Sequence, residues 1–279
     1  MPLVDGQAQL RGLVVGAGTD YRFVTHFNPF VRTNVAGQSG RRVWRDGSWS
    51  GVELAAEAVV PMRIVTLGWD APGFVALHQA LAAAFAPSNQ DLDLTFAIGG
   101  VEYVMRGRPR LVEPEPRRIG GHCYYNAAFV ALDPLIYSST LHTTNLVLPL
   151  VSGGLTLPVT VPFTIGATSV SGRATISNSG KATTGLVVRV DGPVSQPRIT
   201  LTTGGVSEIL RFGFDLTTGQ WIDVDTVART VYINGTVSRR GLSYGDWPTL
   251  DPGSSEVGFD AGTYDAAATC AVSWRDAWR

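Results

Sequence analysis

Cysteine is scarce in this chain, and its few histidines are scattered. The two cysteines are Cys123 and Cys270, and no CxxC pair is present. Two thiols cannot supply a four-cysteine zinc site, so both are interpreted as small buried side chains, with a disulfide as the open alternative. No metal-ligand spacing connects the four histidines, which are His26, His78, His122 and His142. We therefore expect neither a bound metal nor a cofactor.

Lysine is almost absent as well. Lys181 is the only one, so arginine supplies nearly all of the 22 basic side chains, which face 23 acidic ones. A net charge of −1 and a pI of about 6.4 provide no basic field for nucleic acid. We expect no specific nucleic acid binding, whereas planar guanidinium groups suit carboxylate pairing at protein interfaces.

Long apolar runs are missing too. The most apolar stretch, Leu146–Phe163, is interrupted by two glycines and three prolines, so it cannot form a membrane-spanning helix of about 20 residues. Residues Met1–Asp5 show neither a positively charged segment nor an apolar one. We therefore expect no signal peptide, and synthesis in a cytoplasm.

Glycine and proline, by contrast, are frequent, with 32 and 16 residues between short β-branched and aromatic runs. This pattern is typical of an all-β sandwich or barrel. A two-residue hairpin turn is predicted at Gly99-Gly100. In the first half the predicted strands are Leu10–Val15, Tyr21–Thr25, Val52–Val60, Met62–Gly68, Asp91–Ile98, Val101–Arg106 and Tyr124–Leu132.

One helix is predicted, at Pro72–Phe85. Asp70 is the expected cap, and a proline is tolerated in the first turn of a helix. An apolar stripe at helical spacing consists of Phe74, Leu77, Leu81 and Phe85. A lone amphipathic helix among strands is expected to lie across a sheet and bury this stripe.

A boundary near Asp133-Pro134 divides the chain into predicted domains 1–134 and 135–279. Both lengths fit the usual domain size. The second half shows no helical pattern, and Asn234-Gly235 is a strong turn signal. Its predicted strands are Ala167–Ser177, Gly185–Val190, Arg198–Thr202, Glu208–Phe214, Trp221–Val224, Thr230–Ile233, Val257–Phe259 and Thr269–Trp274.

A polar, glycine-rich arm is predicted at Thr33–Ser50. Tryptophan and arginine are favoured anchors at protein interfaces, and a monomer gains little by exposing two tryptophans on a loop. We therefore interpret the arm as a contact with another subunit, and the alternative is that both rings fold back onto their own domain. The candidate interface residues are Arg41, Arg42, Trp44, Arg45 and Trp49.

Glycine motifs of nucleotide-binding and hydrolytic enzymes are incomplete. Gly16-Ala17-Gly18 lacks the third glycine of a dinucleotide fingerprint and is interpreted as a hairpin turn. Gly180-Lys181 is followed by Ala182, where a phosphate-binding loop requires Ser or Thr. Gly37-Gln38-Ser39-Gly40 has Arg41 in place of the last glycine of a nucleophile elbow.

Three carboxylate pairs at i, i+2 spacing would share one face of a strand, as an acid pair requires. Each has an ordinary explanation, because the first opens a strand, the second lies in an extended solvated run and the third precedes a turn. The pairs are Asp91/Asp93, Glu113/Glu115 and Asp223/Asp225. We expect no catalytic residue and no enzyme activity.

Several ordered segments resemble the distal tail protein family of siphovirus-type phages, also called minor tail proteins. The strand Arg63–Gly68 precedes the helix Pro72–Phe85, and Phe129–Ser138 is similar to that family's "aliphatic-Ala-x-Asp-Pro-x-x-Tyr-Ser" junction. The C-terminal half adds Asn178-Ser179-Gly180, Val194–Ile199, Arg229–Gly235, Trp247–Gly253 and Val272–Trp278.

The resemblance implies a mainly β protein with an N-terminal β-sandwich, one helix and a protruding arm, followed by a C-terminal galectin-like β-sandwich. It implies a homohexameric ring at the distal end of the phage tail, in the virion, with a lumen that lets DNA pass. The implied partners are the tail tube protein and the tail tip hub or tail-associated protein, with the tape measure protein as a further candidate.

An alternative function is a host-surface carbohydrate-binding module in the tail tip. Exposed tryptophan rings could stack on a sugar, although core positions are the simpler explanation. The candidate stacking residues are Trp221, Trp247 and Trp274.

Overall fold

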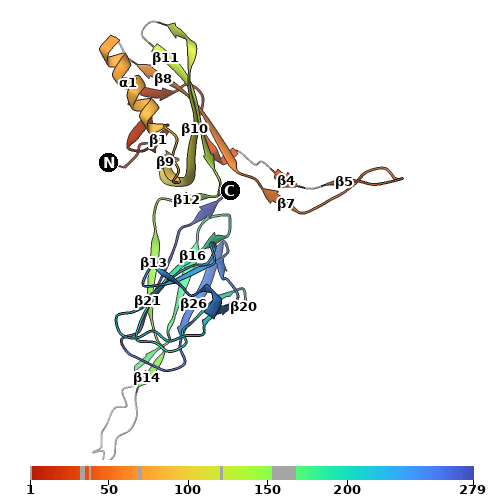
Figure 1. The fold of residues 1–279 in the computed structure, drawn as a ribbon, viewed down its shortest axis with the longest axis vertical. Helices are drawn as coiled ribbons and strands as arrows, with labels where there is room; N and C mark the ends of the chain where they lie inside the picture. The colour runs from red at the N-terminus through yellow and green to blue at the C-terminus, as the bar shows by residue number, and fades with distance from the viewer. Residues whose placement is uncertain (1, 32–34, 38, 68–70, 120–121, 153–167) are drawn as a thin grey trace, which may run out of the picture. The chain divides into compact units, whose positions relative to one another are not determined.

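The computed structural model divides into two compact units (Figure 1). Unit 1 comprises residues 1–139 with 278–279, and unit 2 comprises residues 140–277. The structure describes residues 2–31, 35–37, 39–67, 71–119, 122–152 and 168–279. The predicted cap Asp70 therefore lies outside the described residues.

Unit 1 is built on one continuous strand ladder in the order β2-β1-β9-β10-β11-β8-β3, with β12 paired to β10. The 19-residue strand β10 pairs with β9 up to Gly107 and with β11 from Arg108 onward, so it belongs to both layers of a sandwich. A Cβ on Gly107 would lie 2.2 Å from the carbonyl oxygen of Val130, so this crossing requires glycine. The strands are β1 (Gln7–Leu10), β2 (Leu13–Gly16), β3 (Tyr21–Phe23), β8 (Ala58–Leu67), β9 (Leu92–Ile98), β10 (Val101–Ile119), β11 (His122–Ala131) and β12 (Ile136–Ser138).

The helix α1 (Ala71–Ala84) covers this sandwich, as predicted. Leu81 is fully buried, Phe85 is nearly so, and the rest of the stripe packs against the same core. The hydroxyl of Tyr21 donates to the carbonyl oxygen of Leu77 (3.0 Å), and His78 Nδ1 lies 3.1 Å from the Tyr125 hydroxyl. The helix is thus fixed by apolar burial and by polar contacts to β3 and β11.

The arm is a narrow ribbon, for which we use described residues 35–37 and 39–55. It contains β4 (Val35–Gly37) paired with β7 (Glu53–Ala55), and β5 (Gly40–Arg41) paired with β6 (Ser48–Trp49). In the chain it follows the 3-10 helix η1 (Pro29–Val31) and precedes β8. Figure 1 shows the ribbon running out from the sandwich.

Unit 2 is a second sandwich, made of a six-stranded and a five-stranded sheet. Their inner faces enclose one core that includes Val188, Val224, Ile199 and Val257. The first sheet has β13 (His142–Val147), β27 (Thr269–Trp274), β18 (Val187–Asp191), β21 (Trp221–Asp225), β22 (Thr230–Ile233) and β23 (Val237–Ser238). The second has β16 (Arg173–Asn178), β26 (Gly253–Asp260), β19 (Arg198–Thr203), β20 (Val206–Phe212) and β24 (Ser243–Gly245).

Short elements complete both units. They are the pair β14 (Leu150–Ser152) and β15 (Thr168–Val170), the pair β17 (Thr184–Gly185) and β25 (Thr249–Leu250), η2 (Arg240–Leu242) and β28 (Ala277–Trp278). In unit 1 the Trp278 ring packs edge-on against Tyr103, with centroids 5.2 Å apart.

The mainly β fold class with two sandwiches, one helix and an arm is confirmed. Among the described residues, no helix is long and apolar enough to cross a membrane.

Some predicted strand limits are wrong. Leu10–Val15 is a hairpin, because Arg11 and Gly12 both take positive φ and turn β1 into β2. Pro61 lies inside the single strand β8, so the predicted break there is also wrong. Gly172, with φ +63°, separates β15 from β16 within predicted strand Ala167–Ser177. Gly16-Ala17-Gly18 is a turn, but it does not form the predicted hairpin. It joins β2 to β3, and these strands lie at opposite ends of the ladder and do not pair with each other.

Both cysteines are free and buried, one in each core, as the sequence predicted. The predicted turns are also confirmed. Gly99 and Gly100 take φ +65° and +77° between β9 and β10, and Asn234 and Gly235 take +51° and +70° between β22 and β23.

Candidate functional site

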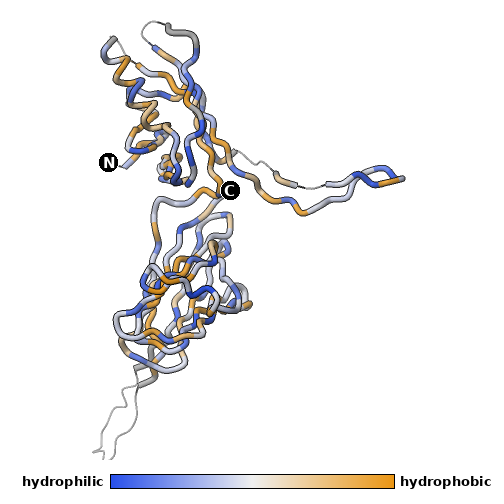
Figure 2. The backbone as a smooth tube through the Cα atoms, viewed as in Figure 1, coloured by the Kyte–Doolittle hydropathy of each residue, from blue (hydrophilic) through white to orange (hydrophobic). Residues whose placement is uncertain are grey.

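The arm is the most exposed structured segment of unit 1. Every described residue from Ala36 to Leu54 is exposed, and Trp44 and Trp49 are 96% and 66% exposed. Figure 2 shows hydrophilic and hydrophobic residues interleaved along it. Exposed apolar residues beside the two tryptophans are Val43, Val52 and Leu54. In this structure the two tryptophan rings do not fold back onto their own domain.

The tip of the arm carries all five predicted interface residues. The backbone N–H of Arg42 donates to the carbonyl oxygen of Gly47 (3.1 Å) and closes the loop between β5 and β6. The Arg42 guanidinium lies 4.8 Å from the centre of the Trp49 ring, a cation–π contact within the ribbon. Among the described side chains, Arg41 and Arg45 make no ion pair.

This ribbon has little to stabilise it by itself. A lone two-stranded hairpin is marginal in water, because ordering its backbone costs about 1–2 kcal/mol per residue and no core offsets that cost. Both edges of the arm also leave backbone groups unpaired, which is a template for another chain. The sequence and geometry together favour a partner that covers the arm.

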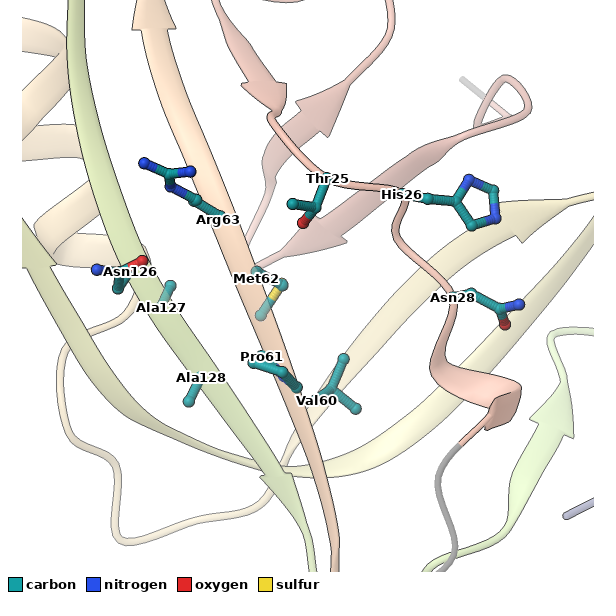
Figure 3. Close-up of a pocket in the computed structure, with 10 residues that line it drawn as sticks. All are labelled: Thr25, His26, Asn28, Val60, Pro61, Met62, Arg63, Asn126, Ala127 and Ala128. Atoms are coloured by element: carbon teal, nitrogen blue, oxygen red, sulfur yellow. The ribbon is translucent and has the colours of Figure 1, made fainter.

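A second feature of unit 1 is a hollow of about 240 Å³ between β8, β11 and the loop after β3 (Figure 3). We call it the β8 hollow. Its lining is Thr25, His26, Asn28, Val60, Pro61, Met62, Arg63, Asn126, Ala127 and Ala128. Figure 3 shows Thr25, His26 and Asn28 on the loop, across from the strand residues Pro61 and Met62.

A polar row crosses three strands beside the β8 hollow. Glu113, Asn126 and Arg63 are cross-strand partners, so their side chains lie on one face of the sheet. Arg63 forms a bidentate ion pair with Glu115, with N–O distances of 2.7 and 2.8 Å. This carboxylate, with the ring of nearby Tyr124, raises the pKa of the Arg63 guanidinium further. None of the described side chains forms an ion pair with Glu113.

The tryptophans proposed for sugar stacking are already engaged. One face of Trp221 is covered by the Arg189 guanidinium at 4.7 Å, and its indole N–H donates to Asp223 (3.0 Å). Arg240 covers Trp247 at 4.5 Å. The Trp274 side chain is buried, and its indole N–H donates to the carbonyl oxygen of Ser177 (2.8 Å). The structure does not bring these three rings together into one stacking surface.

The carboxylate pairs are held in structural roles. Asp91 pairs with Arg108 (2.6 Å) and Asp93 with Arg106 (3.3 Å). Asp225 accepts the backbone N–H groups of Val227 and Ala228, which fixes a turn. These contacts leave neither pair arranged as an acid and a base around an open site. Among the described residues, no group of three or more His, Cys, Asp or Glu side chains could hold a metal ion.

The sequence analysis identified neither the β8 hollow nor the position of Glu113 beside it. Four of the lining residues lie on β8 and three on β11, and their meeting depends on the pairing register of the two strands. A usable signal is the Glu113-Pro114-Glu115 run, because two carboxylates at i, i+2 spacing on one strand share a face of the sheet.

Residues 179–278 match the family model described as siphovirus-type tail component, C-terminal domain. The sequence matches no curated protein. Among solved structures, the chain is similar to the Dit (gp 19.1) protein of phage SPP1, with 13% identity and a TM-score of 0.66, over 98% of this chain and 99% of that one. That protein is described as a paradigm of the hub adsorption apparatus in phages infecting Gram-positive bacteria.

A looser likeness connects the chain with the baseplate of phage P2 in its activated conformation, at 10% identity, a TM-score of 0.48, and coverage of 96% and 97% of the two chains. The family model and the SPP1 fold confirm the resemblance to the distal tail protein family that the sequence indicated.

Proposed function

We propose that this protein is a structural component of a siphovirus-type virion, a hub at the distal end of the tail. The match of residues 179–278 to a tail component and the fold shared with SPP1 Dit over nearly the whole chain support this proposal. In this proposal copies of the chain form a ring between the tail tube and the tail tip or baseplate.

The observation that carries the proposal is the exposed arm. A surface on one subunit that meets a different surface on the next gives a head-to-tail contact, and such contacts close into a ring when the rotation allows it. Trp44 and Trp49, exposed beside three arginines, have the composition of interface anchors. The number six for the subunits comes from the family resemblance alone.

The two halves have separate roles in this proposal. Residues 1–134 form the ring, and residues 135–279 form a galectin-like sandwich on its outside. The partners are the tail tube protein, the tail tip hub or tail-associated protein and, as a further candidate, the tape measure protein. DNA passes through the lumen without specific binding, in keeping with the net charge of −1. The protein is made in the host cytoplasm and resides in the virion tail.

We assign the chain no enzymatic role. Asp91 and Asp93 are paired with arginines, Asp225 is bound by backbone N–H groups, and Glu115 of the remaining pair is held by Arg63, so no pair has both carboxylates free for acid–base work. The carbohydrate-binding alternative is less favoured, because the three tryptophans proposed for it are covered or buried. A glycan array with the purified protein would revive that alternative if it bound one sugar class specifically.

The first test is the native mass of the purified protein, with negative-stain images of the same sample. We expect a ring, and we expect loss of the ring when residues 40–49 are replaced by an Asn-Gly turn. Trp221→Ala in unit 2 is the matched control and should leave the ring intact. A ring that survives loss of the arm contradicts the arm's role, and a monomer that no tail tube protein converts to a ring contradicts the proposed function.

A further inference from the structure

The side chain of Trp44 is held out from the arm by a strained turn. Its backbone has φ +69°, a region that non-glycine residues seldom adopt, and the residue is 96% exposed. Non-glycine residues in this region of φ cluster at functional sites. An indole presented in this way is suited to burial in an apolar cavity of a second surface.

The β8 hollow matches one large side chain in size and in chemistry. Its volume of about 240 Å³ is below the roughly 300–1,000 Å³ of small-molecule pockets. Pro61, Met62, Ala127 and Ala128 provide an apolar lining, while Asn126 and Arg63 provide polar groups beside it. Tryptophan suits such a place, since it buries a large apolar ring and keeps one N–H for a polar partner.

Charge favours the same pairing. Arg41, Arg42 and Arg45 flank Trp44 on the arm, and Asp46 is the only acidic residue among them. Beside the β8 hollow, Glu113 is exposed and has no described ion-pair partner. An arginine entering with Trp44 would therefore meet a carboxylate that is open to bidentate pairing.

The chain's own arm does not fill the β8 hollow, since Trp44 is almost fully exposed and the ribbon runs away from β8 (Figure 1). We propose that Trp44 of one copy inserts into the β8 hollow of a second copy, with an arm arginine paired to Glu113. This inference rests on the proposed ring assembly and adds the place at which each arm docks. The two surfaces are different and lie on the same chain, so the contact is head-to-tail.

The test uses two variants, each with one of the two surfaces damaged. Trp44→Ala removes the inserted ring and keeps the hollow, and Ala128→Trp fills the hollow and keeps the arm. We expect each variant alone to be monomeric by native mass spectrometry, with unchanged circular dichroism and melting temperature. Mixed in equal amounts, they should form a heterodimer and nothing larger, because only one intact junction remains. A mixture that stays monomeric, while the unaltered chain assembles, overturns the inference.

Charge reversal provides a second test that does not depend on packing. Arg45→Glu and Glu113→Arg should each lower the assembly constant by at least tenfold, and the double variant should recover most of the loss. Gln79→Arg, on the exposed face of α1, is the matched control and should have no effect. If Gln79→Arg prevents assembly while Glu113→Arg does not, the arm docks on α1, so the inference fails and the ring proposal stands. Rings that form with every arm variant contradict the inference and leave the ring proposal standing, whereas an unaltered chain that stays monomeric even with the tail tube protein contradicts the ring proposal and the inference together.

Discussion

The side-chain oxygen of Asn178 accepts a hydrogen bond from the backbone N–H of Ala277, 99 residues later in the chain (3.3 Å). The same oxygen accepts the N–H of Gly180 (2.9 Å), and the Asn178 amide group donates to the carbonyl oxygens of Ala182 and Leu250. One buried side chain thus ties three segments of unit 2 together. The Asn178-Ser179-Gly180 segment is thereby joined to the C-terminal segment that contains Asp276 and Ala277.

Replacing Asn178 by alanine should destabilise unit 2 strongly. The substitution leaves buried backbone donors and acceptors without their partner, at about 1–3 kcal/mol each, so we expect a loss of about 3 kcal/mol in the free energy of unfolding. Urea denaturation followed by tryptophan fluorescence measures it. Asn145→Ala, on the exposed face of β13, is the control and should change stability by less than about 0.5 kcal/mol. Equal effects of the two substitutions would contradict the role of Asn178.

Gly180→Ala should be nearly as damaging for a different reason. A Cβ at this position would lie 1.9 Å from the carbonyl oxygen of Ala277, so the C-terminal segment would have to move. We expect faster trypsin cleavage after Arg275 and a lower melting temperature. Gly241→Ala is a matched control, because a Cβ there meets nothing within 4 Å and the backbone has no positive φ. Unchanged protection of Arg275 in Gly180→Ala would rule out this close approach.

Local patterns in the sequence were sufficient for the fold class, the helix and most strands. Helical spacing of Leu81 and Phe85 and the alternation along β8 are local properties, and the structure buries the residues that they indicate. The Arg11-Gly12 turn was missed because an arginine with φ +48° in an otherwise apolar run carries no turn signal. Local structure is therefore predictable where it depends on near neighbours only.

The candidate site was predictable only in part. The arm and its five residues follow from composition, since tryptophan and arginine in a glycine-rich loop are a local signal. The β8 hollow depends on the register of β8 against β11, and the covering of Trp221 by Arg189 depends on the pairing of β18 with β21. Contacts of this kind cannot be derived from one sequence alone, because the sequence does not show which strands pair or in which register.

The β1–β2 hairpin should stabilise the end of α1. The Arg11 guanidinium donates to the carbonyl oxygens of Ala83 and Ala86 at 3.0 Å each, and both carbonyls lie at the C-terminal end of the helix. A positive charge there also interacts favourably with the helix dipole. We expect Arg11→Ala to lower the free energy of unfolding of unit 1 by about 1 kcal/mol.

Amide hydrogen exchange provides a local measurement of this contact. In Arg11→Ala the last turn of α1 should exchange faster, whereas the central residue Leu81 should change less. Arg22→Ala, exposed on β3, is the control and should leave the helix end unchanged. If both variants behave alike, the helix end does not depend on Arg11.

The buried thiol of Cys270 should make unit 2 sensitive to alkaline pH. Burial among apolar side chains, with a smaller contribution from the negative charge of Asp191, raises the pKa of this thiol far above its usual range. In the unfolded chain a cysteine loses its proton near pH 8.5. Above that pH the folded state binds more protons than the unfolded state, so the free energy of unfolding falls as pH rises, by up to about 1.4 kcal/mol per pH unit. Urea denaturation between pH 7.5 and 9.8 should show this slope, and Cys270→Ala should reduce it.

The upper pH limit matters because burial also raises the pKa values of Tyr21 and Tyr125, whose unfolded forms titrate near pH 10. Those tyrosines lie in unit 1, so the loss of stability below pH 9.8 in unit 2 belongs mainly to the thiol.

A thiol reagent offers an independent check, since only the thiolate reacts. At pH 8 the native protein should leave Cys270 unmodified, and modification should appear at the urea concentration that unfolds unit 2. Rapid modification in the native state would contradict the burial from which this pH dependence follows.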